Sequence, residues 1–514
     1  GPVGYSESME QKTSDEFLAY AAAGFNNAMV SDRGSEHCDN ANSSADWRAS
    51  WAQIQAQIAL CHSHNITALV DSYRCLPWGP PTNIGGDAQG SAGGFTPARP
   101  NHKITLPEVQ WLATELTKLP GAAGILITDD GVDLAHNEIQ EIEWMRANTP
   151  SLFPWVNQCG DGSEWLARAG TPFAVPELYS VTGTVNNATT MAQAQLGQYE
   201  SWIGKSQRFG LAHWPLVGVG DGGGIPNINS TSLTMFQAYS AVAYGAKGIM
   251  WYCWGQAIWQ FGNASIGLKP GTTHIYPAIA EVNFRLGDHW APAVAAHQQW
   301  QGVFNTGWSV PGGLEPRQGR LVEAMSSDLL VGVMTTAAPS AAAPTGDGSS
   351  TLLVIVDKRL SDDLPAAPAR AVSVTLGAAA GSNPQILSLS GGTASASFDS
   401  ASRVLSIRGL SGGDAVAVVS KQAAAGALAA DLHYWRFNVQ RPSMGSVWTS
   451  QYQFYQTLYA KRATTRTSFI LANLDAVTTE SAVESVAADG GFNLVTANEQ
   501  ASYGTVLNVG PAIE

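Results

Sequence analysis

The stretch GILITDDGVDL, residues 124–134, joins a short apolar run to a group of acidic residues. The run at 125–127 is uninterrupted, which is typical of a strand that is buried on both faces of a parallel sheet. Asp129 and Asp130 follow almost directly, and Asp133 comes after a glycine and a valine. The place of this strand in the fold therefore decides whether the two adjacent acids face a pocket.

Short apolar runs alternate with amphipathic helical segments from residue 1 to about residue 310. This alternation is typical of βα units around a parallel sheet. Eight such units in roughly 300 residues predict a (β/α)8 TIM barrel, a fold of the α/β class. The eight expected strands lie at 3–5, 25–31, 66–73, 124–130, 153–158, 173–179, 213–221 and 248–255.

The pattern changes after about residue 310. Alternating strands separated by Gly, Ser, Pro and Ala loops predict an all-β sandwich over 311–425, behind a barrel at 1–310. Residues 426–514 are expected to form a small C-terminal α/β segment of unknown role. Within it, residues 467–500 share a strand, helix, strand order and a Gly-Phe-Asn triplet with the start of the chain. Convergence and the stub of a second barrel are both open explanations.

The composition limits what the chain can bind. Of its 514 residues, 45% are apolar and 13% are charged, and the net charge is −14. Nucleic acid is not an expected partner, because phosphate binding requires a basic surface. No apolar segment reaches the roughly 18 residues that a membrane span needs. We therefore expect a multidomain globular protein with a large core.

Several features favour a secreted or extracellular glycoprotein. Five Asn-x-Ser/Thr sequons lie in the first 265 residues, and a leading Gly-Pro can remain after a leader is removed. Cys38 and Cys75 follow the second and third expected strands at the same rim, which predicts a disulfide between them. A metal site among the acids and the histidine of residues 32–40 is the weaker hypothesis, so no metal is expected.

Polar residues gather at the C-terminal ends of the expected strands, the rim that carries the active site of TIM barrels. Two carboxyl groups across a pocket can cleave a glycosidic bond, because one protonates the leaving oxygen while the other attacks the sugar or activates water. We expect Asp130 to be the general acid and Glu177 the nucleophile or base, with Asp221 as the alternative to Glu177. This mechanism requires no cofactor. The residues expected to bind the substrate are Arg33, Asp71, Asp129, Asn157, Tyr179, Trp251, Trp254 and Gln256.

The last expected strand is rich in aromatic side chains. Alternation along a strand sends Trp251 to one face and Tyr252 and Trp254 to the other. One set therefore packs under the helices, and the other lines the mouth of the barrel, where an indole can stack on a sugar ring. The 17 tryptophans of the chain fit core packing or such sugar platforms.

Three motifs carry a resemblance to a known family. The chain is similar to barrel glycoside hydrolases related to family 42 and clan A. It resembles even more a group of barrel proteins with Thr-Asp-Glu-Pro and Asp-x-Tyr-Pro strand ends and a Tyr-Gly-Ala-Lys-Gly-Ile junction. The resemblance covers roughly residues 10–300 and implies a barrel followed by a β-sandwich. The motifs are GILITDDGVD at 124–133, PELYS at 176–180 and MFQAYSAVAYGAKGIMWYCW at 235–254.

The chain departs from that group at the acidic positions. Asp129-Asp130-Gly131 stands where the group has Asp-Glu-Pro, and Glu177-Leu178-Tyr179 stands where it has Asp-x-Tyr. Clan A barrels carry Asn-Glu on strand four and Glu on strand seven, whereas strand seven here ends on Asp221. The resemblance therefore implies an acid/base role for Asp130 and leaves the second carboxylate open between Glu177 and Asp221.

Two functions follow as hypotheses. The first is a glycoside hydrolase that cleaves an oligo- or polysaccharide at the C-terminal rim of the barrel. The second is a non-catalytic carbohydrate-binding barrel that has lost its catalytic pair, as the departures from the family would suggest. A carbohydrate is the expected partner in both. The sugar, the stereochemistry of cleavage and the oligomeric state are open.

Overall fold

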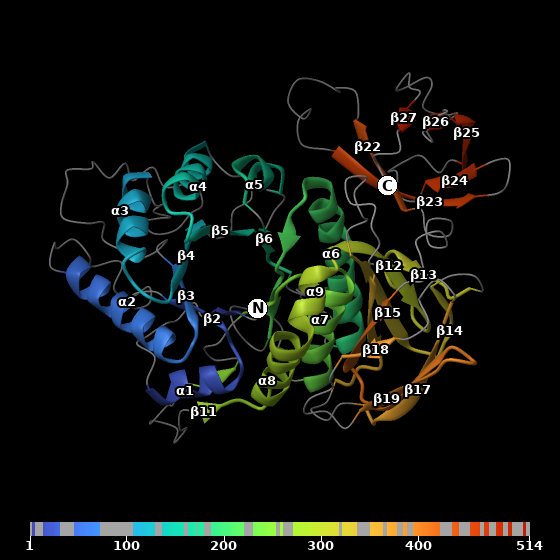
Figure 1. Cartoon of the computed structure of the whole chain (residues 1–514), viewed down its shortest axis with the longest axis horizontal. Coiled ribbons are helices and arrows are strands. Elements are labelled where there is room, and N and C mark those ends of the chain that lie inside the picture. Colours follow the sequence, from blue (N-terminus) through green and yellow to red (C-terminus); the bar gives the residue numbers. More distant parts are fainter. Residues whose placement is uncertain are drawn as a thin grey trace.

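The computed structural model describes most of the barrel and the sandwich and six strands near the C-terminus (Figure 1). The described residues are 3–5, 14–30, 46–71, 106–128, 136–158, 163–171, 173–178, 187–219, 230–252, 258–260, 271–317, 321–336, 350–362, 367–377, 384–387, 394–421, 434–440, 453–462, 467–471, 480–486, 492–495 and 507–509.

Parallel strands form a closed ring in the first half of the chain. Strands β1 to β7 pair in parallel, each with the next, and β9 pairs in parallel with β1 and with β8. A parallel bridge between Glu177 and Leu216 closes the ring, because it joins the end of β6 to β8. Pro215 separates β7 from β8, because proline has no N–H to donate to a ladder. The predicted (β/α)8 barrel is confirmed. Its strands are β1 (Val3–Tyr5), β2 (Asn27–Val30), β3 (Thr67–Asp71), β4 (Ala122–Thr128), β5 (Phe153–Gln158), β6 (Phe173–Pro176), β7 (Ala212–His213), β8 (Leu216–Gly218) and β9 (Met250–Tyr252).

Helices follow the strands and cover the outside of the ring (Figure 1). No helix in the described parts of the chain is long and apolar enough to cross a membrane. A short antiparallel pair, β10 (Trp259–Gln260) and β11 (Gly271–Thr272), follows β9. The helices are α1 (Ser14–Ala22), α2 (Asp46–Ser63), α3 (Leu106–Leu116), α4 (His136–Asn148), α5 (Ser163–Ala169), α6 (Ala188–Phe209), α7 (Thr231–Ala243), α8 (Tyr276–Phe284), the π-helical η4 (Arg285–Trp290) and α9 (Ala291–Ala296).

Two sheets form the predicted β-sandwich, and all their strand pairs are antiparallel except the parallel pair of β12 and β13. The larger has the order β13-β12-β15-β16-β21-β18 and the smaller β14-β17-β20-β19. Their strands are β12 (Gln299–Asn305), β13 (Gly313–Leu314), β14 (Val322–Met325), β15 (Leu329–Thr335), β16 (Ser350–Asp357), β17 (Arg370–Leu376), β18 (Gln385–Ile386), β19 (Ser395–Asp399), β20 (Val404–Leu410) and β21 (Ala415–Lys421).

The sandwich begins before the predicted boundary at residue 311. Strand β12 pairs antiparallel with β15, so residues from 299 onward belong to the larger sheet. A bulge between Trp300 and Gly302 shifts the register of this pair, and Gly302 has a φ of 139°, which favours glycine. The bulge breaks the apolar alternation by which a strand is recognised in a sequence.

Both faces of the larger sheet are buried. Alternate side chains of β15 and β16 pack against the smaller sheet, and the others pack against the barrel, where α7 lies between barrel and sandwich (Figure 1). This is the alternation expected of a strand between two apolar layers. The first set is Val331, Val333, Leu353 and Ile355, and the second is Leu330, Met334, Leu352 and Val354.

Sheet and helix approach most closely at two glycines. A Cβ on Gly332 would lie 2.2 Å from the backbone oxygen of Ala243 at the end of α7. A Cβ on Gly413, whose φ is +79°, would lie 1.9 Å from the backbone oxygen of Ser232 near its start. Because neither site has room for a side chain, the contact between α7 and the sandwich requires glycine at both.

The C-terminal segment differs from the prediction. Its described residues form a six-stranded antiparallel sheet in sequence order, and the helix expected near residue 480 is instead strand β25. The repeated valines of this stretch favour a strand, and β25 pairs on both sides with its neighbours. The strands are β22 (Tyr434–Gln440), β23 (Gln453–Arg462), β24 (Thr467–Leu471), β25 (Glu480–Val486), β26 (Phe492–Val495) and β27 (Leu507–Val509).

Candidate active site at the end of strand β6

The strand register shows which side chains face the barrel interior. Phe173 on β6 lies opposite Ala212 on β7, and Ala174 lies opposite His213. The His213 ring contacts the Ser206 hydroxyl of α6 at 3.0 Å, so His213 and Ala174 face the helices. Phe173 therefore faces inward, and by alternation Glu177, four residues on, faces inward too.

Glu177 and Asn157 come together at the C-terminal ends of β6 and β5. The Asn157 amide donates a hydrogen bond to Glu177 Oε1 over 2.6 Å, and Asn157 is 1% exposed while Glu177 is half-buried. The Glu177 backbone N–H donates to the Gln158 carbonyl at 2.7 Å. Neighbouring strands thus hold both the backbone and the carboxylate of Glu177. Two of the predicted site residues lie side by side.

Helix α6 supports this position from the outside. The Gln195 side chain donates to the Leu178 carbonyl at 3.1 Å, directly after Glu177. The Leu178 N–H donates to the Leu216 carbonyl of β8 at 2.9 Å. Gln195 was not predicted, although the sequence holds a signal for it: a glutamine lies on the apolar face of α6, where a buried amide requires a partner.

Trp251 corrects the predicted set of sugar-binding residues. Its indole is fully buried and donates to Asn283 Oδ1 of α8 at 2.9 Å, and Asn283 donates in turn to the Ala23 carbonyl at 2.9 Å. Trp251 therefore packs under the helices, away from the interior. Trp251 was expected among the substrate-binding residues, and its buried indole, bonded to Asn283, contradicts that expectation.

For the other predicted site residues, the structure gives at most a position relative to a strand and no side-chain contact. Asp71 is the last residue of β3 and lies opposite Leu126 of β4 in register. Strand β4 ends at Thr128, directly before the paired acids. The acid/base assignments therefore stay predictions, as do secretion and the disulfide. Arg33, Cys38, Cys75, Asp129, Asp130, Tyr179, Asp221, Trp254 and Gln256 lie outside the described residues.

Within the described ranges, histidines, cysteines and acids form no group of three or more that could hold a metal ion. Cys61 is fully buried in the barrel core. Burial, together with a smaller effect of the nearby Lys247 charge, lowers the pKa of His213 from 6.5 to about 3. His213 is therefore neutral at physiological pH, and it faces the helices rather than the interior.

The Tyr-Gly-Ala-Lys-Gly-Ile junction at 244–249 has a packing role. The Lys247 ammonium donates to the carbonyls of Val294 and His297, at 3.1 and 2.8 Å, and so ties the junction to the end of α9. A Cβ on Gly248 would lie 2.8 Å from the Trp214 ring. The contacts of the motif that carries the strongest resemblance are thus packing contacts, and the motif is no evidence for catalysis.

Comparison with known proteins gives structural likeness alone. No protein-family model matches the chain, and no curated protein matches it. A beta-galactosidase from Marinomonas ef1 is 9% identical with a TM-score of 0.41, over 59% of this chain and 63% of that one. A family 30 endoxylanase from Clostridium papyrosolvens is 11% identical, with a TM-score of 0.36 over 82% of this chain and 95% of that one. A family 51 alpha-L-arabinofuranosidase from Bifidobacterium longum is 10% identical, with a TM-score of 0.39 over 81% and 92%.

Proposed function

We propose that the chain is a glycoside hydrolase that cleaves an oligo- or polysaccharide at the C-terminal rim of its barrel. The observation that carries the proposal is the Glu177 carboxylate, which faces the interior at the end of β6 and is fixed by the Asn157 amide. TIM-barrel enzymes place their chemistry at this rim. A carboxylate oriented there has the position that attack on a sugar requires.

The geometry favours Glu177 as the nucleophile or base. An amide N–H that donates to a carboxylate stabilises its charged form, which is the form that attacks the anomeric carbon or accepts a proton from water. We assign the general acid to Asp130, two residues after the end of β4, where it would protonate the leaving oxygen. Asp221, which follows β8, is the alternative second carboxylate.

The test is hydrolysis of a panel of aryl glycosides and plant, fungal and bacterial polysaccharides by the wild type and its variants. Glu177→Gln should lower kcat by about 10³-fold with glycan binding retained, because the isosteric amide cannot act as a base or nucleophile. Asp130→Asn should have a similar effect on substrates with poor leaving groups. Asp399→Asn changes an exposed carboxylate of the sandwich and serves as the matched control.

Two further measurements separate the assignments. If Glu177 is the nucleophile, hydrolysis by the wild type should retain the anomeric configuration of the substrate, as seen by proton NMR. Glu177→Ala should then form, in the presence of azide, a glycosyl azide of inverted configuration, because azide displaces the leaving group in a single step. If Glu177→Gln is as active as the wild type, the role of second carboxylate should be assigned to Asp221 instead of Glu177. A wild type that binds glycans without turning them over would instead favour the non-catalytic binding barrel.

A further inference from the structure

A short sandwich segment, residues 357–362, connects the larger sheet to two barrel helices. We call it the strap. It starts at the last residue of β16 and reaches the N-termini of α6 and α7. Helix α6 follows β6, whose end carries Glu177, and α7 follows β8. The strap therefore contacts the two helices next to the candidate site, although it belongs to another domain.

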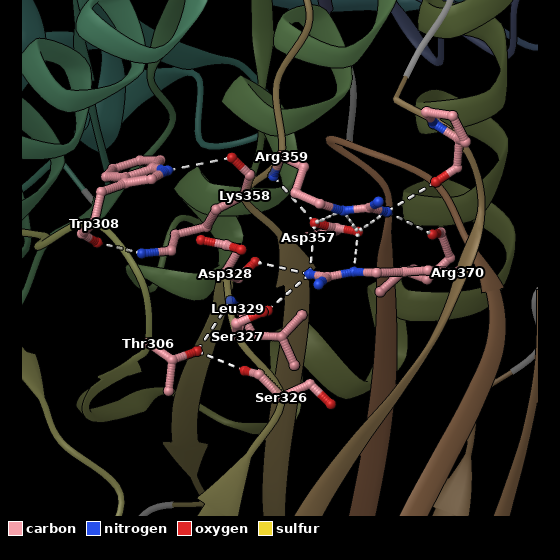
Figure 2. Close-up of polar contacts among 12 residues, drawn as sticks. Thr306, Trp308, Ser326, Ser327, Asp328, Leu329, Asp357, Lys358, Arg359 and Arg370 are labelled. Carbon is pink, nitrogen blue, oxygen red and sulfur yellow. Dashed lines mark hydrogen bonds and ion pairs between the residues drawn. The ribbon is translucent and has the colours of Figure 1, made fainter.

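Buried ion pairs anchor the strap in the sandwich (Figure 2). The fully buried Asp357 carboxylate accepts hydrogen bonds from Arg359 at 2.7 Å and from Arg370 at 3.0 Å. The Lys358 ammonium bonds to the Asn305 side chain and the Trp308 carbonyl, and lies 4.2 Å from the centre of the Trp308 ring. Charged groups held on several sides leave this end of the strap little freedom to move.

The other end of the strap binds the first turns of two helices. Asp362 Oδ1 accepts a hydrogen bond of 2.6 Å from the N–H of Ala188, the first residue of α6. The Ser361 N–H donates to the Ser232 hydroxyl at 2.9 Å, and the hydroxyls of Ser230 and Ser232 donate to the Ser361 carbonyl. The free N–H groups and the positive dipole end of a helix favour such oxygens.

Helix α6 carries this contact to Glu177. Gln195 lies two turns after Ala188, about 10 Å along the helix, and donates to the carbonyl that follows Glu177. The Tyr199 hydroxyl donates to the Gln237 carbonyl at 3.0 Å, so α6 and α7 are joined as well. A shift at the start of α6 would therefore move the end of β6.

We infer that the strap positions Glu177, with Asp362 acting through α6 and Gln195. Asp362 is a positioning residue, since it lies on the sandwich and acts on Glu177 through the helix. The sandwich then belongs to the catalytic unit and is more than an appended module. The kinetic part of this inference rests on the proposed hydrolase function. The structural part, which is the placement of residues 173–178, does not.

The experiment compares Asp362→Ala, Asp362→Asn and Gln195→Leu in the full chain, with Asp399→Ala as control. Asp399 is an exposed sandwich carboxylate that also accepts a backbone hydrogen bond, from Ala401, and within the described residues its hydrogen bonds stay inside the sandwich. Asp362→Ala should lower kcat about tenfold with KM changed less than twofold, because a small misplacement of a reacting group affects the chemical step. Asp362→Asn keeps the acceptor oxygen and should restore most of kcat.

Backbone hydrogen exchange of residues 173–178 provides a measure that is independent of activity. It should be about tenfold faster in Asp362→Ala and Gln195→Leu than in the wild type and the control. Unchanged exchange in both variants would overturn the inference, as would faster exchange with unchanged kcat in an active enzyme. If the wild type hydrolyses no glycan, the proposed function fails, and the exchange data alone then support or overturn the placement. If Asp362→Ala does not fold, Gln195→Leu gives the same decision.

Discussion

The rim at Glu177 and the strap at Asp357 both hold a carboxylate in place, but with different partners. Asp357 is fully buried between two guanidinium groups, each of which carries a full positive charge. Glu177 is half-buried and receives its hydrogen bond from the neutral amide of Asn157. A buried carboxylate that is paired with two arginines has a structural role. Glu177, by contrast, is only half-buried, so solvent reaches part of its side chain.

The comparison separates stability from activity. Buried ion pairs cost desolvation energy that their attraction repays only while every partner is present. Loss of one partner in the strap should therefore act mainly on folding, whereas loss of the amide at the rim should act mainly on catalysis.

Asp357→Ala should produce the largest loss of stability. It leaves the Arg359 and Arg370 guanidinium groups without their shared carboxylate at a site where Asp357 is 0% exposed. We expect a loss of about 3 kcal/mol in the free energy of unfolding, measured by urea denaturation. Asp399→Ala removes an exposed carboxylate of the same sandwich and should change stability far less. Equal effects of the two substitutions would contradict the role of the buried pair.

Asn157→Ala should have a smaller effect on folding and a clear one on catalysis. The hydrogen bond to a charged carboxylate is worth about 2 kcal/mol, which corresponds to roughly a 30-fold loss of kcat. Asn148→Ala provides the control, since Asn148 is an exposed asparagine on α4. A variant with full kcat and lowered stability would place Asn157 in the same structural class as Asp357.

Lys247 sharpens the comparison, because it is a partly buried cation whose ammonium donates to the carbonyls of Val294 and His297 and lies 4.0 Å from Met334 Sδ of the sandwich. Burial lowers the pKa of Lys247 from 10.5 to about 8. Between these two pKa values the unfolded chain binds more protons than the folded protein, so the free energy of unfolding rises with pH. The stability that Lys247 gains in this way at high pH is lost again as the pH falls toward 8.

Lysine 247 should contribute about 1 kcal/mol per pH unit to this rise. Lys247→Met should therefore flatten the slope of unfolding free energy between about pH 8 and about pH 9.5 by that amount. Lys118→Met, at a lysine that is 59% exposed, should leave the slope unchanged. The same slope in all three proteins would show that Lys247 is not desolvated as its position requires.

The barrel could be predicted because its strands are short apolar runs bounded by polar and glycine-rich loops. The limits of that signal are visible at particular residues. Pro215 divides the seventh predicted strand into β7 and β8. The bulge at Gly302 interrupts the apolar alternation of β12, so this strand was not predicted from the sequence. In the C-terminal segment, the stretch at 480–486 fits a helical pattern, but pairing with two neighbouring strands makes it β25.

The site was predicted in part. Glu177 and Asn157 could be chosen because both are polar residues at the ends of apolar strands, and adjacent strands bring such residues together. Alternation cannot say which face of a strand is inside, so Trp251 was named with the substrate-binding residues although its indole packs against α8. Asp362 lies 174 positions from Ala188 in a polar loop, and no local pattern reports a contact over that distance.

The burial of α7 between barrel and sandwich has a consequence for the order of synthesis. Residues 232–243 are all buried, and part of their cover is the turn at Gly413, which leaves the ribosome about 170 residues later. At about 5–20 residues per second, an apolar helix would wait roughly 10 to 30 seconds for its partner sheet. The nascent barrel therefore has a period in which it needs a chaperone or risks aggregation, and a ribosome pause between residues 243 and 413 would lengthen it.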